Sequence, residues 1–148
     1  MSGMNTKVKE RSIEDISKYA PIYISGKISG LSDLNEPAFQ QAEDALASRG
    51  FLRSNVINPL KLHDQTVKGM SWEDYMWIDI STITSRRIAA MIVLYDWAQS
   101  RGAVLEVIMA LSLGVPIFDM EFRNITGDVV NHLSGSPKWY LNMVMGNG

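Results

Sequence analysis

The chain has 148 residues, of which 46% are hydrophobic, so it is long enough for one core. Its net charge of −2 gives no electrostatic reason to expect a nucleic-acid partner. It has no cysteine, and its two histidines match no metal-binding spacing, so we expect no disulfide, no cysteine zinc site and no metal centre, although carboxylates alone can hold Mg²⁺. It lacks both the ~18-residue apolar run of a membrane span and the apolar run of a signal peptide, so we expect a cytoplasmic protein with no membrane partner.

Residues 1–20 read as an N-terminal extension that is too polar to enter the core, and residues 21–148 as one domain. The domain begins with a buried strand at residues 21–25 that runs into a glycine-containing loop. A helix at residues 37–49 follows, because proline is favoured at the first helical position and glycine stops a helix. A second short strand at residues 55–58 ends before a proline.

A serine-capped helix comes next and carries several apolar residues together with Asp79. Residues 88–95 are continuously apolar, as expected for a central parallel strand that is covered on both faces. An apolar helix at residues 102–113 and a strand at residues 115–118 complete a β-α-β-α-β-α-β order, which predicts a parallel sheet with helices on both faces. An apolar tail at residues 139–145 needs cover from its own domain or from a second subunit.

Ligands of open parallel sheets bind beyond the carboxyl ends of the strands, where the strand order reverses. In this chain the residues after the first strand are 25–30, Asn58 follows the second strand, and residues 96–102 follow the third, beginning with Asp96 and Trp97. We therefore expect the chemistry of the protein to lie among these segments.

Glu106 is the strongest local signal for chemistry. Its helix is apolar nearly all round, which predicts burial, and a buried carboxylate is costly unless it is paired or needed. Small neighbours at Gly102, Ala103 and Ala110 leave room beside it for a ligand. Alternatively, a glutamate in an early helical turn complements the helix dipole and can pair with Arg101. The local sequence favours neither interpretation over the other.

Other candidate side chains carry weaker signals. Asp79 lies between two isoleucines, but most helix carboxylates are solvated, so a place on the solvent face beside Glu73 is the favoured interpretation. Tyr23 in the first strand and Trp97 after the third can pack on a base or a sugar. A tyrosine in a strand more often belongs to the core, so the local pattern favours a structural role for Tyr23.

The loop after the first strand supplies glycines, hydroxyls and a lysine in the residues Ser25, Gly26, Lys27, Ser29 and Gly30. Free backbone N–H groups in such a loop can bind a phosphate or a sugar hydroxyl, although a plain turn is the alternative. The loop is neither a Walker loop nor a dinucleotide fingerprint, which disfavours a kinase or a dinucleotide oxidoreductase. Ser100 and Arg101 begin the third helix, whose amides favour an anion, and Ser100 equally suits an ordinary N-cap.

Three motifs in this order resemble the nucleoside 2-deoxyribosyltransferase superfamily, and most closely its small phage and prophage members. They are residues 23–30, residues 72–76 with Asp79, and residues 100–106. The resemblance implies one flavodoxin-like (Rossmann-like) α/β domain, with a parallel sheet of four or five strands and helices on both faces. It also implies a homodimer or larger homo-oligomer whose sites borrow residues from a neighbour.

The resemblance further implies a role for each matching residue. Glu106 would attack C1′ of a deoxyribose as the base departs, which gives a glycosyl-enzyme ester. Asp79 would position or protonate the base, and Tyr23 would orient Glu106 or the sugar. The 25–30 loop, Ser100 and the amides near Gly102 would hold the 5′ end of a nucleoside or nucleotide. The mechanism that the resemblance implies requires no metal and no organic cofactor.

Ser100 departs from the transferase pattern, which has an aspartate six positions before the glutamate. A serine there is similar to the related 2′-deoxynucleoside 5′-monophosphate N-hydrolases, in which it contacts the phosphate. This favours hydrolysis of a nucleotide over exchange of bases. A protein that binds a nucleotide-derived ligand in the same cleft without chemistry remains the alternative, because a fold does not fix a function.

Overall fold

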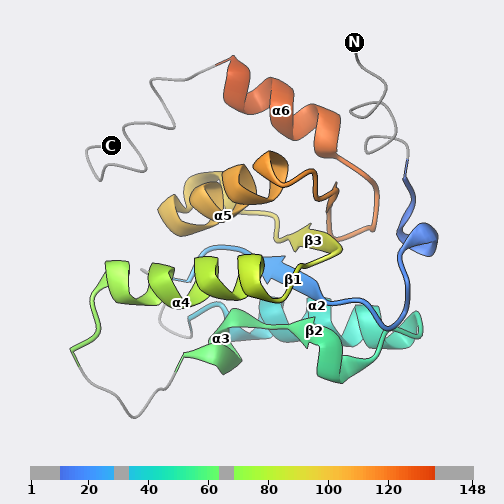
Figure 1. Ribbon diagram of the computed structural model, residues 1–148, viewed down its shortest axis with the longest axis horizontal. Coiled ribbons are helices and arrows are strands. Elements are labelled where there is room, and N and C mark those ends of the chain that lie inside the picture. The colour runs from blue at the N-terminus through green and yellow to red at the C-terminus, as the bar shows by residue number, and fades with distance from the viewer. Residues whose placement is uncertain (1–10, 29–33, 64–68, 136–148) are drawn as a thin grey trace.

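The computed structural model describes residues 11–28, 34–63 and 69–135 (Figure 1). Its strands are β1 (Ile22–Ser25), β2 (Val56–Ile57), β3 (Ala90–Val93) and β4 (Ile117–Phe118). They form one parallel sheet in the order β2-β1-β3-β4, which confirms the predicted parallel α/β fold. The chain passes from β1 to β2 on one side and then crosses to β3 on the other, so the strand order reverses between β1 and β3.

Helices cover both faces of this sheet, as predicted. The helices are α2 (Glu36–Ser48), α3 (Pro59–Leu62), α4 (Trp72–Ser85), α5 (Arg101–Ser112) and α6 (Thr126–Ser134), and the short 3₁₀ turns are η1 (Ile13–Asp15), η2 (Arg53–Asn55) and η3 (Trp97–Gln99). The α2 helix packs on one face, whereas α4, α5 and α6 contribute to the core on the other. The neighbouring α4 and α5 are both visible in front of the sheet in Figure 1.

Alternate residues of β1 face opposite sides of the sheet, because successive strand side chains point in opposite directions. Ile22 and Ile24 pack with Phe39 of α2 in one core. Tyr23 belongs to the other core, together with Val104 of α5. This burial on both faces explains why the strands read as continuous apolar runs.

The segment before β1 corrects one expectation. Ile13 and Ile16 are each 2% exposed and belong to the core beside α2, although residues 1–20 were predicted to be too polar for it. The two isoleucines are three positions apart, and a 3₁₀ turn has three residues, so both point to the same side of η1. Asp15 Oδ2 stabilises this turn by accepting the N–H of Ser12 at 2.9 Å.

Two caps position the elements around the carboxyl edge of the sheet. Ser71 Oγ accepts the N–H of Asp74 at 3.1 Å, which confirms the predicted serine cap of α4. Asn58 Oδ1 accepts the N–H of Leu60 at 3.1 Å and begins α3, a short helix that the sequence did not predict. Pro59 fits there because it occupies the first helical position, where no backbone donor is needed.

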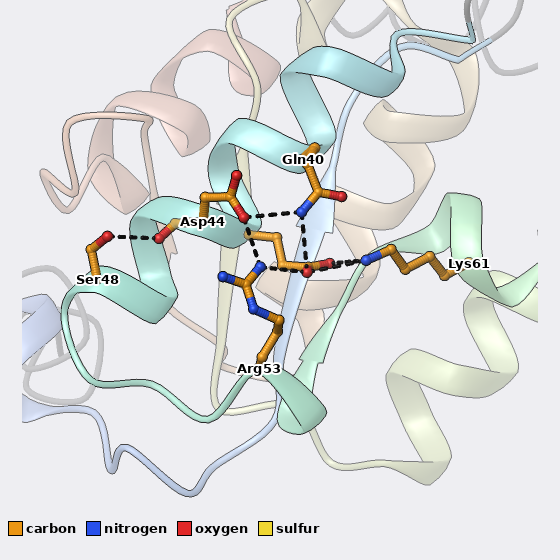
Figure 2. Close-up of polar contacts among 6 residues, drawn as sticks. Gln40, Asp44, Ser48, Arg53 and Lys61 are labelled. Atoms are coloured by element: carbon orange, nitrogen blue, oxygen red, sulfur yellow. Dashed lines mark hydrogen bonds and ion pairs between the residues drawn. The ribbon is translucent and has the colours of Figure 1, made fainter.

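A buried carboxylate on α2 binds two cations that flank β2, and Figure 2 labels these cations as Arg53 and Lys61. Glu43 is 2% exposed, and its two oxygens bind Lys61 Nζ at 2.9 Å and Arg53 Nη1 at 2.8 Å. Burial raises the pKa of Glu43, but the hydrogen bonds from Lys61 and Arg53 outweigh it and hold this pKa below its usual value. The ionised form is therefore the one that the fold stabilises.

Removing both cations is expected to leave this buried charge uncompensated. We expect Arg53→Met with Lys61→Met to lower the free energy of unfolding at pH 7 by about 1–2 kcal/mol, because Glu43 is buried but both cations are half-exposed. Urea unfolding at pH 7 measures the change, and each single variant serves as a control that keeps one cation. A double variant as stable as the natural chain would show that the two cations do not support Glu43.

Candidate active site

A cavity of about 180 Å³ lies near the carboxyl ends of β1 and β3, at the reversal of strand order. It is bounded by the loop after β1, by α3 and α4, and by the first turns of α5. The lining residues are Gly26, Ile28, Leu34, Leu60, His63, Trp72, Tyr75, Met76, Asp79, Ser100, Gly102, Ala103 and Glu106. The cavity therefore lies where the sequence predicted a ligand.

Glu106 faces this cavity from α5 and is 4% exposed. The Tyr23 hydroxyl donates to Glu106 Oε2 at 2.9 Å, and the Ser25 hydroxyl donates to Glu106 Oε1 at 2.7 Å. Within the described part of the chain, no lysine, arginine or histidine forms an ion pair with this carboxylate. The guanidinium of Arg101, the partner suggested by the local sequence, instead lies 3.6 Å over the ring of Trp72.

The environment of Glu106 favours its protonated form. Burial raises its pKa most, the nearby negative charge of Asp79 raises it further, and the hydrogen bonds from Ser25 and Tyr23 only partly oppose this. The result is a pKa well above the usual value of 4.5. Burial, followed by the charge of Glu106, also raises the pKa of Tyr23, so its hydroxyl stays a hydrogen-bond donor.

The second carboxylate of the site is Asp79, which is paired with a histidine. His63 Nε2 lies 2.7 Å from Asp79 Oδ1, and both residues are buried. The imidazole also packs on the ring of Tyr75, with the centroids 4.6 Å apart. The solvent position that the local sequence favoured for Asp79 is wrong, because Asp79 lies on the face of α4 that carries the buried Met76 and Ile83.

His63 is the residue of the candidate site that sequence reasoning missed. Its only signal was its position, five residues after Asn58 at the end of the second strand. The short α3 helix carries the chain back to the cavity and ends at the residue before His63. The sequence predicted no element between the second strand and the serine-capped helix, so nothing indicated that His63 returns to the cavity.

Some predicted binding residues line the cavity. Ser100 Oγ accepts the N–H of Ala103 at 3.1 Å, so it is an N-cap of α5 as well as a lining residue. Gly26 has no room for a side chain, since an added Cβ would lie 2.4 Å from Leu94 Cδ1. An added Cβ at Gly102 would lie 3.1 Å from Sδ of the flexible Met76 side chain and 3.7 Å from Trp72 Nε1, so this position is less constrained.

Other predicted binding residues lie near the cavity without lining it. The N–H of Lys27 points to Asp96 Oδ1 at 3.5 Å, which joins the loops after β1 and β3. Trp97 packs edge-on against His132 of α6, with the ring centroids 5.8 Å apart. The predicted residues Ser29 and Gly30 fall outside the described part of the chain.

The site thus joins two carboxylates with different partners. Two hydroxyls hold Glu106, whereas an imidazole holds Asp79. Such a pair can divide the tasks of nucleophile and acid, as in enzymes that cleave glycosidic bonds.

Among the described residues, no three acidic or histidine side chains form a group that could hold a metal ion. No helix within those residues is long and apolar enough to cross a membrane.

Comparison with known proteins identifies the family to which the chain belongs. Neither a curated protein nor a solved structure matches the chain. Residues 20–119 match a family model described as a domain of unknown function, DUF4406, and these residues run from β1 through β4. The match includes Tyr23, Asp79 and Glu106 and covers more than half of the chain, so the protein belongs to the DUF4406 family.

Proposed function

We propose that the protein cleaves the N-glycosidic bond of a deoxynucleoside or a deoxynucleoside 5′-monophosphate, with Glu106 as the nucleophile. The observation that supports this most is the setting of Glu106, which is buried, held by two hydroxyls and exposed to a cavity. A buried carboxylate with a purely structural role is normally paired with a cation, as Glu43 is. The motifs shared with the nucleoside 2-deoxyribosyltransferase superfamily suggest the same chemistry.

In the first step, an oxygen of ionised Glu106 attacks C1′ of the deoxyribose while the bond from C1′ to the base nitrogen breaks. The electron pair of that bond leaves with the base, which takes a proton from the hydrogen-bonded pair of His63 and Asp79. Tyr23 and Ser25 hold the two oxygens of Glu106, so the carboxylate keeps its orientation as its charge is lost. The product is a glycosyl ester on Glu106.

In the second step, water attacks C1′ of this ester and restores the Glu106 carboxylate. The pair of His63 and Asp79 accepts the proton that the water releases, so the site returns to its starting state. The sum is one nucleoside and one water converted into one free base and one deoxyribose. A second base in place of water would give transfer instead of hydrolysis.

The cavity is smaller than the roughly 300–1,000 Å³ of pockets that enclose a drug-sized ligand. At about 180 Å³ it holds the reacting part of a nucleoside, and the rest of the substrate would extend beyond it. Trp72, Tyr75 and Met76 give it an aromatic and apolar wall against which a base can stack. Ser100 and the first amides of α5 lie on the same cavity and offer donors to a 5′ hydroxyl or phosphate.

A second candidate function is the binding of a nucleotide-derived ligand without chemistry. The raised pKa of Glu106 favours it, because a protonated carboxyl is a poor nucleophile and a good hydrogen-bond donor. Catalysis requires that the proton pass from Glu106 to the pair of His63 and Asp79 when the substrate binds, whereas a binding protein has no such requirement.

The two functions are separated by incubating the protein with deoxynucleosides and their 5′-monophosphates, with and without an acceptor base. We expect chromatography to show released base, and we expect Glu106→Gln to reduce the rate by about 10³-fold or more, as for loss of a nucleophile. The exposed Glu121→Gln variant is the control. Exchange that requires the acceptor would indicate a transferase, and tight binding without turnover would indicate the second function.

A further inference from the structure

The outer face of α4 carries an exposed tryptophan and a half-buried isoleucine between polar residues. Glu73, Trp77, Ile80 and Thr84 follow one another at spacings of four, three and four residues, so they lie along one side of the helix. Trp77 is 75% exposed, which is unusual for so large an apolar side chain. A groove of about 290 Å³ runs beside it, and six of the seven residues that line this groove are apolar.

The first turn of α4 carries acidic side chains, and basic side chains follow its last turn. Glu73 and Asp74 lie in the first turn, whereas Arg86 and Arg87 follow the last turn, and all four are exposed. Ile80 lies midway between Glu73 and Arg87 along the chain. An identical helix laid antiparallel across this face, with the two-fold axis near Ile80, would therefore place acid against base at both ends.

We propose that this face of α4, together with the groove formed with α5, is the interface between two copies of the chain. In a two-fold arrangement the same surface is used by both copies, and this surface is complementary to itself. Trp77 of each copy would enter the groove of the other, beside Leu105 and Met109 of α5. An aromatic side chain that fills an apolar groove near the centre is typical of the residues that carry most of the binding energy.

This interface lies next to the candidate active site. Trp72 and Met76 line both the groove and the site cavity, so the second copy would pack against the outside of one cavity wall. The inference does not depend on the proposed chemistry, because it rests on the shape, apolarity and charge order of α4. The state of assembly and the release of base are measured separately, so either proposal can fail alone.

Light scattering coupled to size exclusion tests the interface with the full chain over a series of concentrations. We expect a mass of twice the 16.5 kDa of one chain. We expect Trp77→Glu to raise the dissociation constant at least 100-fold while circular dichroism shows a folded protein. Tyr19→Glu is the matched control, because Tyr19 is equally exposed at 74% but lies before β1, and it should remain a dimer.

Charge reversal tests the antiparallel arrangement. Glu73→Arg and Arg87→Glu are each expected to weaken the dimer at least tenfold, because each places like charges opposite one another at both ends. The double variant restores opposite charges and should regain most of the affinity. A natural chain that is monomeric throughout the series, or a Trp77→Glu protein that dimerises normally, would overturn the proposal. A monomer would also be the result if another protein, or the chain's own residues 136–148, covered this face.

Discussion

Glu106→Gln is expected to stabilise the protein, and to do so increasingly as the pH rises above the usual glutamate pKa of 4.5. Glutamine keeps the shape of the side chain and can still bond to Tyr23 and Ser25, but it never has to be buried as an anion. A residue placed for chemistry rather than for stability should behave in this way.

The sign follows from the pKa of Glu106, which burial and the charge of Asp79 raise in the folded protein. The folded state therefore binds the proton more tightly than the unfolded state does. The stability that this proton contributes is fully present below the unfolded pKa and is lost as the pH rises through the folded pKa. The difference between the variant and the natural chain grows by about 1.4 kcal/mol for each unit by which the folded pKa is raised.

Urea unfolding at several pH values between 4 and 9, on both proteins, measures this difference. Glu43→Gln is the matched control, because Glu43 is also a buried glutamate but has a lowered pKa. The stability that the ionised Glu43 contributes is present above the unfolded pKa and is lost as the pH falls through the folded pKa. Glu43→Gln should therefore be less stable than the natural chain at neutral pH. A Glu106→Gln difference that does not change with pH would contradict the prediction.

His63→Gln is expected to lower the rate of base release by about 10²–10³-fold, within the range for loss of a general acid. His63 Nε2 lies 2.7 Å from Asp79 Oδ1, so the two share the proton that we assign to the departing base. For a deoxyribosyl substrate that releases 4-nitrophenolate, the loss in the rate of the first step, measured as the initial burst of 4-nitrophenolate, should be less than about tenfold, because that leaving group needs no proton.

Comparing the two substrates distinguishes proton transfer from a merely structural role. If His63 only supported the fold of the site, the rates on both substrates would fall by the same factor. Glu121→Gln is the control, since this exposed side chain does not line the cavity and should leave both rates close to those of the natural chain. Equal losses in the first-step rates on both substrates for His63→Gln would remove His63 as the acid of that step.

The elements of the fold could be read from the sequence because each has a local cause. The continuous apolar run at residues 88–95 predicts a strand that is covered on both faces, and β3 lies at its centre. Ser71 and Ser100 stand where helices begin, and both accept a backbone N–H in the structure. The short α3 helix and the burial of Ile13 escaped prediction, because neither segment is long enough to show a period.

The sequence by itself determined that Glu106 lies in an apolar helix and that the carboxyl edge of a parallel sheet holds the candidate site. Only the tertiary structure decided what surrounds that carboxylate. Tyr23 and Ser25 lie more than 80 positions from Glu106, and His63 meets Asp79 across 16. Periodicity and caps report interactions within a few residues, whereas these contacts depend on how β1, α4 and α5 pack together. Whether a buried glutamate meets a cation or two hydroxyls is therefore fixed by packing.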